Sequence, residues 1–216
     1  MKFGLIGHPI SHSQSPALFK KAYGGRWAYD LIETSDFEEA WRRFLDGYHA
    51  VNVTMPFKGH AAARADILSD DVCSTGAANI LVKTDKGICA HNSDVLALRS
   101  ILERFPADSS IAVIGCGGAG KAALCAADGR FHDIKAFHHD GITSGVAADI
   151  IIYTLPCAVP GFDRLECSHI IEANYKDPCM EFMKSTGTEY IPGEEWLLAQ
   201  AREGYALMTG ETPFLY

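Results

Sequence analysis

The sequence predicts an α/β protein, on the strength of three observations. Short apolar segments with the composition of strands alternate with helical segments along the chain. The first predicted strand, Phe3–Ile6, is followed by the dipeptide Ser15-Pro16, which is typical of a helix start. In the second half, an apolar strand at Ile111–Ile114 and an alanine-rich helix flank the glycine-rich turn of residues 115–120. The length of 216 residues allows one or two domains.

The composition is that of an ordinary globular protein and argues against several functional classes. Hydrophobic residues make up 48% of the chain and charged residues 21%, so a sizeable core can form. The net charge of −8 argues against nucleic acid and anionic membranes as partners, and no cluster of Lys and Arg reverses this locally. No apolar run has the length of a membrane span, and the first ten residues lack the features of a signal peptide. We therefore expect a cytoplasmic protein.

The seven cysteines are odd in number and scattered, without a C-x-x-C pair. Several lie inside apolar runs, which is typical of buried, reduced thiols. They predict neither a disulfide framework nor a metal site, which agrees with a cytoplasmic location.

The segment Asn52–Lys58 places polar side chains at the end of an apolar strand. Residues Tyr48–Val53 are predicted to form a short buried strand, and Pro56 prevents it from continuing. Thr54 and Lys58 then lie where a strand opens into a loop, the usual place for ligand-binding side chains in sheet proteins. A lysine there can supply both a positive charge and a proton. The alternative is a solvated surface lysine.

A second group of polar residues lies at the start of the first helix. Ser15 is the expected N-cap of a helix that runs to Tyr23 and ends at Gly24. Ser13, two residues earlier, has no capping role in this arrangement. Free backbone N–H groups and the helix dipole favour an anion at this end, so the two hydroxyls predict a carboxylate site. The alternative for Ser15 is capping alone.

Hydrophobic periodicity predicts the next elements. Tyr29–Glu33 is a predicted strand, and Ser35–Glu38 has the pattern of a capping box. The helix that follows has apolar residues spaced to fall on one face, which we assign to the core: Phe37, Ala40, Trp41, Phe44 and Leu45. A further alanine-rich helix is expected over His60–Leu68.

A hairpin and a helix start carry two more candidate residues. Ile80–Lys83 and Ile88–His91 are predicted strands joined by a tight turn. Asn79 precedes the first strand, where a turn role and a ligand role are both compatible with the pattern. Asp94 opens the next helix, where an acidic residue can be a helix cap alone. The apolar face of that helix comprises Val95, Leu98, Ile101 and Leu102.

The turn Gly115–Gly120 has the spacing G-x-G-x-x-G. Its glycines allow a tight turn and let a pyrophosphate approach the N-terminus of the following helix, which is expected to end near Asp128. The next predicted strand, Ile134–His138, ends in His138-His139-Asp140. An acidic residue at the distance of Asp140 commonly binds the ribose 2′-hydroxyl of a dinucleotide, and a turn aspartate is the alternative.

This second part departs from a complete nucleotide-binding fold. Asp149–Tyr153 is predicted to be the next parallel strand, yet only the eight residues 141–148 connect it to the strand before. A crossover helix with its loops needs about a dozen residues or more, so we expect this helix to be missing. Ile170–Ile171 is another short predicted strand, and a last helix is expected over Glu194–Met208.

These motifs together resemble those of the shikimate dehydrogenase family. The shared segments occur in the family's order and near its spacing: Gly7–Pro16, Asn52–Lys58, Gly76–Asn79, Asn92–Asp94 and Gly117–Ala119. The resemblance covers nearly the whole chain and implies two α/β domains. Residues 1–94 with 195–216 would form a substrate-binding and catalytic domain, and residues 95–194 a reduced, Rossmann-like NAD(P)-binding domain.

The resemblance also implies roles for individual residues. Ser13 and Ser15 would hold the carboxylate of shikimate or 3-dehydroshikimate. Lys58 and Asp94 would be the catalytic pair, because reducing a ring ketone needs a proton, which a lysine beside a carboxylate can supply. The other expected substrate-binding residues are Thr54, Asn79, Tyr175 and Gln200. The expected cofactor-binding residues are Gly115, Gly117, Gly118, Ala119, Gly120, His138, Asp140 and Thr154.

The activity implied is that of a shikimate dehydrogenase of the chorismate and aromatic amino-acid pathway. Such an oxidoreductase acts on a CH–OH group and reversibly reduces 3-dehydroshikimate with NADP(H), here as a monomer or homodimer. One alternative is an NAD-dependent quinate/shikimate dehydrogenase, because Asp140 would repel a 2′-phosphate where the family commonly has an arginine motif. The other is a non-catalytic shikimate-binding protein that has lost its nucleotide site, an alternative suggested by the short 141–148 connection.

Overall fold

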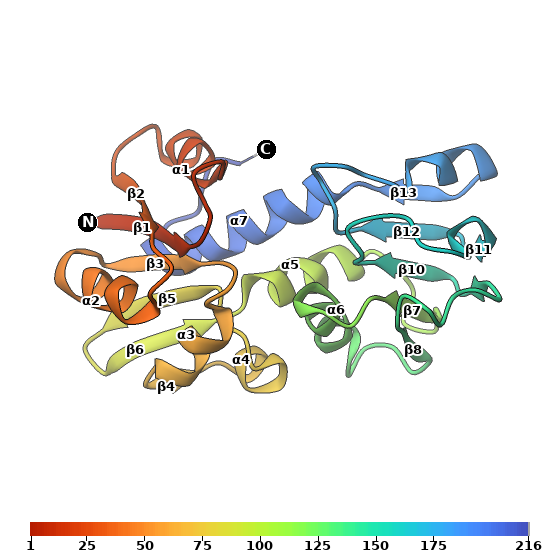
Figure 1. Ribbon diagram of the computed structural model, residues 1–216, viewed down its shortest axis with the longest axis horizontal. Helices are drawn as coiled ribbons and strands as arrows, with labels where there is room; N and C mark the ends of the chain where they lie inside the picture. Colours follow the sequence, from red (N-terminus) through yellow and green to blue (C-terminus); the bar gives the residue numbers. More distant parts are fainter. Residues whose placement is uncertain (216) are drawn as a thin grey trace. The chain divides into compact units, whose positions relative to one another are not determined.

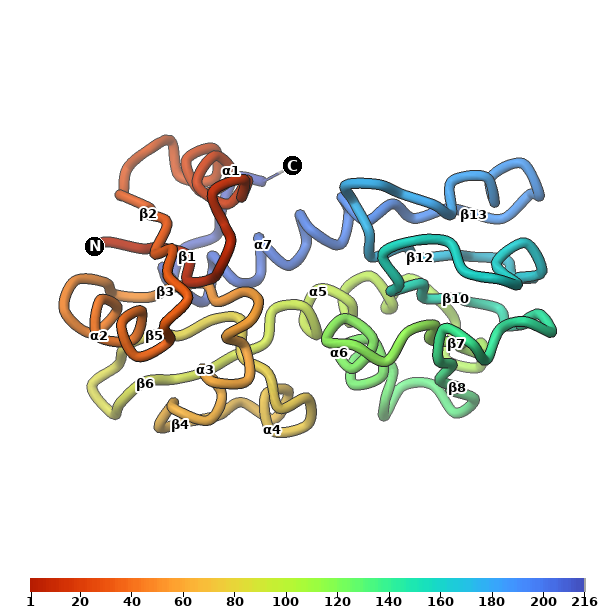
Figure 2. Tube along the Cα trace, in the orientation of Figure 1, coloured from red at the N-terminus to blue at the C-terminus, as the bar shows by residue number. Residues whose placement is uncertain are grey.

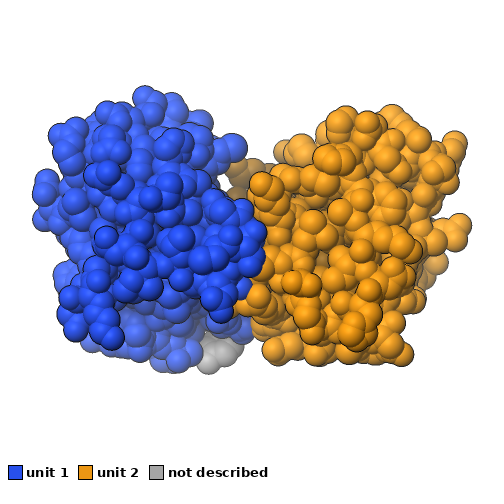
Figure 3. Space-filling view, turned by 90° about the horizontal axis from the view of Figure 1, so that it is seen from below, with its two compact units in different colours: residues 1–93, 200–216 blue, residues 94–199 orange. Residues whose placement is uncertain are grey.

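The computed structural model describes residues 1–215, which form two compact units (Figure 1). Unit 1 comprises Met1–Ser93 and the segment from Gln200 onward, and unit 2 comprises Asp94–Ala199 (Figure 3). Tyr216, which we assigned to the first domain, lies outside the described residues. The expected boundaries were residues 94 and 195, and the second of these lies inside α7 (Gly193–Thr209), which is one continuous helix (Figure 2). Its first turns, with Trp196 and Ala199, pack into the core of unit 2.

Unit 1 contains a six-stranded mixed sheet with the order β2-β1-β3-β5-β6-β4. Its strands are β1 (Lys2–Gly7), β2 (Ala28–Glu33), β3 (Ala50–Val53), β4 (Ile67–Leu68), β5 (Ile80–Thr84) and β6 (Gly87–His91). β1 runs parallel to β2 and β3, whereas β5 runs antiparallel to β3 and β6. The predicted hairpin and the first three predicted strands are therefore confirmed, with small shifts at their ends.

Helices cover both faces of this sheet. The helices are α1 (Ser15–Tyr23), α2 (Phe37–Gly47), α3 (Lys58–Arg64) and α4 (Asp70–Thr75), with the second half of α7. One core cluster joins α2, α3 and α4 to the sheet, and the other joins α1 and α7 to the opposite face. β1 supplies both clusters, with Phe3 on one face and Ile6 on the other, as the period of a strand requires.

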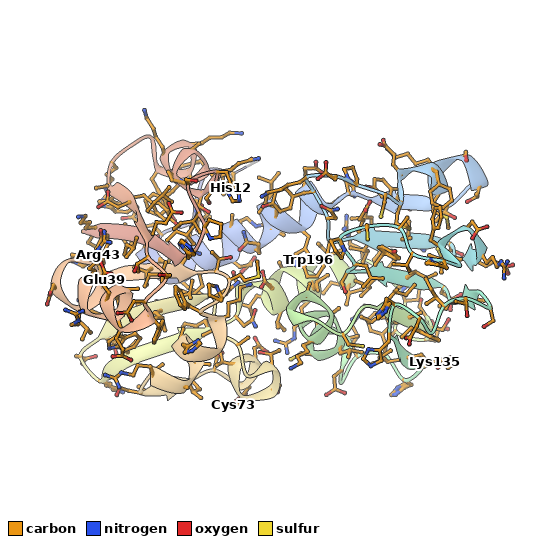
Figure 4. The ribbon with its side chains drawn as sticks, in the orientation of Figure 1. His12, Glu39, Arg43, Cys73, Lys135 and Trp196 are labelled. Atoms are coloured by element: carbon orange, nitrogen blue, oxygen red, sulfur yellow. The ribbon has the colours of Figure 1, made fainter. Side chains whose placement is uncertain are left out.

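Three local predictions in unit 1 are wrong. The helix expected over His60–Leu68 ends at Arg64, and Ile67–Leu68 instead forms an edge strand beside β6. The N-cap of α2 is Asp36 rather than Ser35, because the Asp36 carboxylate accepts a hydrogen bond from Glu38 N. Leu45 is 43% exposed, so the core face of α2 stops at Phe44. The opposite face of α2 carries the exposed pair Glu39 and Arg43 (Figure 4).

Unit 2 contains a five-stranded parallel sheet with the order β13-β12-β10-β7-β8. Its strands are β7 (Ile111–Ile114), β8 (Ile134–Phe137), β10 (Ile150–Tyr153), β12 (His169–Glu172) and β13 (Glu189–Ile191). A complete doubly wound nucleotide-binding sheet has the order 3-2-1-4-5-6, in which β8 and β7 correspond to strands 2 and 1. Among residues 1–215, the sheet has no strand beyond β8, so the outer strand of the complete order is missing.

The two faces of the unit 2 sheet are covered differently. On one face lie α5 (Ser93–Leu102), α6 (Gly118–Ala127) and the start of α7. On the other face the core is filled from loops, the short sheet of β9 (Val146–Ala147) with β11 (Leu165–Glu166), and the 3-10 turns η1 (Phe162–Arg164) and η2 (Glu181–Thr186). Ile142 and Val146 of the short connection are both buried there. The expected loss of a crossover helix is therefore confirmed.

The cysteines are all free, as expected for reduced thiols. Their predicted burial is wrong, however, because Cys73 on α4 and Cys157 are exposed and the other five are half-buried (Figure 4). Within residues 1–215, no helix combines the length and apolar character needed to cross a membrane.

Candidate active site

Strand pairing brings the polar residues of unit 1 to one edge of its sheet. β1 and β3 run parallel and pair Ile6 with Val53, so their C-terminal ends lie together. β5 runs antiparallel to β3 and pairs Ile80 with Asn52, which brings the residue before β5, Asn79, to the same edge. The backbone confirms this proximity, because Val53 N donates to Asn79 O at 2.8 Å.

Thr54 and Lys58 lie at this edge, in the predicted positions after β3. Thr54 N donates to Ile6 O at 2.8 Å, which continues the ladder by one residue. Lys58 is the first residue of α3 and is half-buried. Its carbonyl oxygen accepts a hydrogen bond from Ala78 N at 2.9 Å, so the start of α3 is tied to the turn that leads to Asn79.

Gly7 allows the loop after β1 to pack against this turn. A Cβ atom on Gly7 would lie 2.4 Å from Thr54 Cγ2 and 2.7 Å from Ile10 Cγ2, closer than any real side chain is found. His8 N donates to Met55 O at 3.1 Å across the same contact. The Gly7-His8-Pro9 segment is therefore part of what fixes Thr54.

The two serines at the start of α1 differ from expectation, because Ser13 makes the local hydrogen bonds and Ser15 is not the N-cap. Ser15 is not the N-cap: that residue is Gln14, whose side chain makes no capping hydrogen bond. Instead, the Ser13 hydroxyl accepts from Ser15 N at 3.2 Å and donates to Ser15 Oγ at 3.2 Å. α1 has no acidic residue in its first turn and two lysines in its last turn, so its N-terminal end keeps the positive character that favours a carboxylate.

Two tyrosines lie beside these serines. Tyr205 OH donates to Ser15 O at 3.2 Å, and Tyr29 OH donates to Asn52 Oδ1 at 2.7 Å. Burial raises the pKa of Tyr29 well above its usual value; Tyr205 adds to the shift and a hydrogen bond with Ser15 opposes it. Burial also raises the pKa of Tyr205. Both phenols are therefore neutral donors near neutral pH.

Asn79, Ser93 and Gln200 form a hydrogen-bonded chain across three elements of unit 1. Asn79 Nδ2 donates to Ser93 Oγ at 3.1 Å, and Ser93 N donates to Asn79 Oδ1 at 2.7 Å. Ser93 Oγ in turn donates to Gln200 Oε1 at 3.3 Å. Two predicted site residues that are distant in sequence are thus joined through a third that we did not predict.

In unit 2, each glycine of the G-x-G-x-x-G turn is explained by a different local feature of the backbone. Gly115 has a φ of 103°, and a Cβ atom there would lie 2.4 Å from Thr154 Oγ1. A Cβ atom on Gly120 would lie 1.8 Å from Gly115 O, so α6 approaches β7 this closely only with glycine. Gly117 and Gly118 are exposed, and a Cβ atom on either would meet no atom within 4 Å. This open backbone is the cradle that a pyrophosphate requires.

The surroundings of the turn also fit a dinucleotide. α6 begins at Gly118 with Ala119 behind it, and its first turn carries no acidic residue, so its positive end is available to a phosphate. Thr154, at the end of β10, donates its hydroxyl to Ile114 O at 2.8 Å and so holds the turn between the two strands. β7 and β10 flank the point where the strand order reverses, which is where open α/β sheets bind ligands.

The residues expected on the adenosine side lie at the end of β8. His138, His139 and Asp140 follow Phe137 and are all exposed. Gly141 N donates to His138 O at 3.0 Å, so residues 138–141 form a turn. Asp140 is therefore both a turn residue and an acid at the C-terminal end of the strand, so the geometry fits either expectation. Lys135, on β8 itself, is also exposed (Figure 4).

Asp94 and Tyr175 belong to unit 2. Asp94 lies in the first turn of α5, and its carbonyl oxygen accepts from Trp196 Nε1 at 3.2 Å. Tyr175 lies in the loop after β12 and is half-buried. A Cβ atom on Gly193 would lie 2.8 Å from Tyr175 N, so α7 can start against this loop only with glycine.

Glu172 anchors the loop that carries Tyr175. This carboxylate at the end of β12 is fully buried and accepts three hydrogen bonds: from Cys179 N at 2.7 Å, Met180 N at 3.2 Å and Tyr190 OH at 2.7 Å. Burial, together with Glu172, raises the pKa of the Cys179 thiol to about 12. The Glu172 side chain, at the end of β12, therefore holds the far end of the loop, at Cys179 and Met180, next to its start.

Sequence reasoning missed four residues that shape these sites: Tyr29, Asn52, Ser93 and Glu172. Ser93 lies in the motif Asn92–Asp94, but nothing in the sequence indicates a role for it. The other three are polar residues within apolar strands, and their partners come from other elements. Within residues 1–215, no group of three or more His, Cys, Asp and Glu side chains is arranged to hold a metal ion.

Comparisons with known proteins find shikimate dehydrogenases among the relatives of this chain. A model of the shikimate dehydrogenase substrate binding domain matches residues 5–81. The shikimate dehydrogenase (NADP(+)) of Thioalkalivibrio sulfidiphilus is 38% identical over 134 residues, which cover 57% of this chain and 49% of the relative. The match thus spans about half the length of the first curated relatives. The enzyme of the same name from Ignicoccus hospitalis is 27% identical over 252 aligned residues, covering 99% of this chain and 95% of the relative. That alignment is longer than this chain, so the relative has residues that this chain lacks.

Solved structures show the same fold. A shikimate 5-dehydrogenase from Thermus thermophilus, solved with NADP(H) and shikimate, has a TM-score of 0.84 at 21% identity and covers 99% of this chain and 95% of that one. An Ael1 enzyme from Pseudomonas putida has a TM-score of 0.82 at 26% identity, covering 98% and 94%. The chain is thus similar to shikimate dehydrogenases over the substrate-binding domain, residues 5–81, and shares the fold of these solved structures.

Proposed function

We propose that the chain is a shikimate dehydrogenase that reversibly reduces 3-dehydroshikimate to shikimate with NADP(H). The observation that carries this proposal is the coexistence of two sites in one chain. In unit 1, the polar residues of a substrate-binding domain lie at one edge of the sheet. In unit 2, every glycine of the dinucleotide turn has the local geometry of its role. The relatives named shikimate dehydrogenase (NADP(+)) support this reading.

The residues of unit 1 supply binding. Ser13 and Ser15, at the positive end of α1, would hold the carboxylate of the substrate. Thr54, Asn79 and Gln200 would bind its ring hydroxyls. Tyr175 in unit 2 keeps its expected role as a substrate-binding residue.

Lys58 supplies the proton. Reducing the ring ketone places negative charge on its oxygen, and a lysine ammonium can stabilise that charge and then donate a proton to it. Asp94 is the expected second member of the pair and would help hold the lysine in its charged form. The nicotinamide, when bound, supplies the hydride that no side chain can provide.

The nucleotide is expected to bind through its pyrophosphate at Gly117 and Gly118, whose backbone is open. We propose NADP as the cofactor, in line with the named relatives. NAD is the second candidate, because the exposed Asp140 would repel a 2′-phosphate, whereas His138 and His139 would attract it only when protonated. We keep the expectations of a cytoplasmic protein that is a monomer or homodimer.

The test is the appearance of reduced nicotinamide when purified protein is mixed with shikimate and either NADP or NAD. We expect turnover with NADP, and the ratio of kcat/KM for the two nucleotides reports their relative fit. Faster turnover with quinate and NAD would favour the quinate/shikimate dehydrogenase. No turnover with either nucleotide, while calorimetry still shows shikimate binding, would favour the non-catalytic shikimate-binding protein, the candidate suggested by the missing crossover helix.

A further inference from the structure

Thr154 follows β10 and is half-buried. We expected its side chain to bind the nucleotide, but its hydroxyl proton is directed at the protein backbone. Thr154 Oγ1 donates to Ile114 O at 2.8 Å, and Gly115 O, at 3.3 Å, is a second acceptor within reach. A hydroxyl has a single proton, so either bond leaves none for a phosphate.

Two glycines of the turn make room for this hydroxyl. A Cβ atom on Gly115 would lie 2.4 Å from Thr154 Oγ1, and one on Gly120 would lie 3.4 Å from the same atom. β7 ends just before Gly115, and Gly120 lies in the first turn of α6. The hydroxyl therefore lies where β7, β10 and α6 meet.

The start of the turn is held from two sides. On the side of β8, Gly115 N donates to Phe137 O at 2.8 Å, and Cys116 Sγ donates to the same oxygen at 3.8 Å. On the side of β10, Thr154 N and Thr154 Oγ1 both donate to Ile114 O, the last carbonyl of β7. The direction in which the turn leaves the sheet is therefore set by its contacts with both neighbouring strands.

That direction matters for an anion bound at the turn. Gly117 and Gly118 come next and are exposed, and they begin α6, where the first N–H groups of a helix have no intrahelical partner. A pyrophosphate there is bound by the backbone, so its affinity depends on where these N–H groups point. A small displacement of the turn is enough to weaken such a site.

We propose that Thr154 is a positioning residue for nucleotide binding, whose hydroxyl holds the start of the glycine turn so that the backbone N–H groups of Gly117 and Gly118 point at the pyrophosphate. Thr154 does not contact the nucleotide in this account. The inference rests on the proposed function, since it takes a nicotinamide dinucleotide as the ligand of the turn.

The test is fluorescence titration of NADPH and of NADH into wild type, Thr154→Ala and Thr154→Ser. Serine keeps the hydroxyl and alanine does not, so the two variants differ in that group alone. We expect Thr154→Ala to bind both nucleotides about tenfold more weakly, the equivalent of about one hydrogen bond. Thr154→Ser restores most of this loss. The loss is the same for NADPH and NADH, because they share the pyrophosphate and differ only in the 2′-phosphate.

Thr188→Ala is the matched control. Thr188 is buried just before β13, and its hydroxyl donates to Cys167 O, ahead of β12, at 2.9 Å. This is the same kind of hydrogen bond at the opposite edge of the same parallel sheet. We expect denaturant titration to show similar losses of stability in Thr154→Ala and Thr188→Ala, whereas only Thr154→Ala weakens nucleotide binding.

Four outcomes would overturn the proposal. They are wild-type affinity in Thr154→Ala, a Thr154→Ser protein as weak as Thr154→Ala, an equal loss of affinity in Thr188→Ala, and a loss confined to NADPH, which would place the side chain beside the 2′-phosphate. If Thr154→Ala does not fold, Thr154→Val, which keeps the branched shape without the hydroxyl, takes its place. Failure of both to fold would assign Thr154 to the fold alone and also overturn the proposal.

The outcome is separable from that of the proposed function. A wild-type protein that binds nucleotide without turnover of shikimate would contradict the dehydrogenase, while the titrations still decide the role of Thr154. A wild-type protein that binds neither NADPH nor NADH would overturn both.

Discussion

Unit 1 and unit 2 each place candidate ligand-binding residues at the strand ends of a sheet, but different elements cover the two sheets. In unit 1, helices cover both faces of the sheet. In unit 2, helices cover one face, and loops that bury Ile142 and Val146 cover the other. The dinucleotide turn is nevertheless built as in a complete fold, because its geometry depends on β7, β10 and α6. The comparison shows that one face of the sheet can lose its helices while the glycine turn, whose contacts come from β7, β10 and α6, keeps its geometry.

The largest effect is expected from Lys58→Ala, which removes the proposed proton donor from unit 1 and leaves both units folded. We expect kcat/KM for shikimate to fall by about 10²–10⁴-fold, the usual contribution of general acid–base catalysis. Lys86→Ala, on the exposed turn of the β5–β6 hairpin, is the control. Activity in Lys58→Ala close to that of wild type would show that the proton comes from elsewhere.

The next largest effect concerns the reduced face of unit 2. Ile142 is fully buried although it lies in the short connection, so Ile142→Ala is expected to lower the free energy of unfolding by about 2–4 kcal/mol. Thr143→Ala, at the exposed next residue, is expected to change it little. Denaturant titration measures both. Equal, small effects would mean that the connection is not part of the core, and that the second face of the sheet is open.

The two halves of the dinucleotide turn are expected to respond differently to alanine. Gly120→Ala forces a Cβ atom against Gly115 O and should lower the free energy of unfolding by about 1–3 kcal/mol. Gly118→Ala meets no protein atom, so it should leave stability unchanged and weaken nucleotide binding instead. Thermal unfolding and nucleotide titration distinguish these outcomes. A destabilised Gly118→Ala protein would show that its backbone is not open.

The smallest effect is a pH dependence in unit 1. Burial lowers the pKa of His91, with Asp71 opposing the shift, so the folded protein resists protonating this side chain. This contribution to stability is then fully present above the unfolded pKa near 6.5 and is lost as the pH falls below it toward the lowered folded pKa. His91→Gln should flatten the fall in stability below about pH 6.5, which denaturant titration over a pH series measures. An identical slope in His91→Gln would assign it to other groups.

Local composition was sufficient to predict the strands of four or more residues, the hairpin, the glycine-rich turn and the missing crossover helix. The apolar runs Ile111–Ile114 and Ile150–Tyr153 and the glycine spacing are properties of contiguous sequence. The strands β4, β9, β11 and β13 were missed because segments of two or three residues carry no periodic signal. The N-cap of α1 was assigned to Ser15 instead of Gln14 because the cap depends on the backbone angles of Gln14, which its residue type does not determine.

The candidate site was predictable where one segment carries it and not where several meet. Thr54 and Lys58 follow from a strand and a proline in the same seven residues. The Ser93 chain depends on pairing between distant segments, since Asn79, Ser93 and Gln200 come from three elements. Tyr29 likewise reaches Asn52 across the sheet, and sequence shows only a tyrosine in an apolar strand.

The central claim is that the reduced unit 2 still binds its nucleotide. Titration of NADPH into the full-length protein, followed by the fluorescence of the nicotinamide, tests it most directly, with Gly118→Ala as the comparison. We predict saturable binding to wild type that is weakened in the variant. No saturable binding to a wild-type protein that still binds shikimate would contradict the claim, and would mean that the loss of the outer strand and helix has cost unit 2 its nucleotide site.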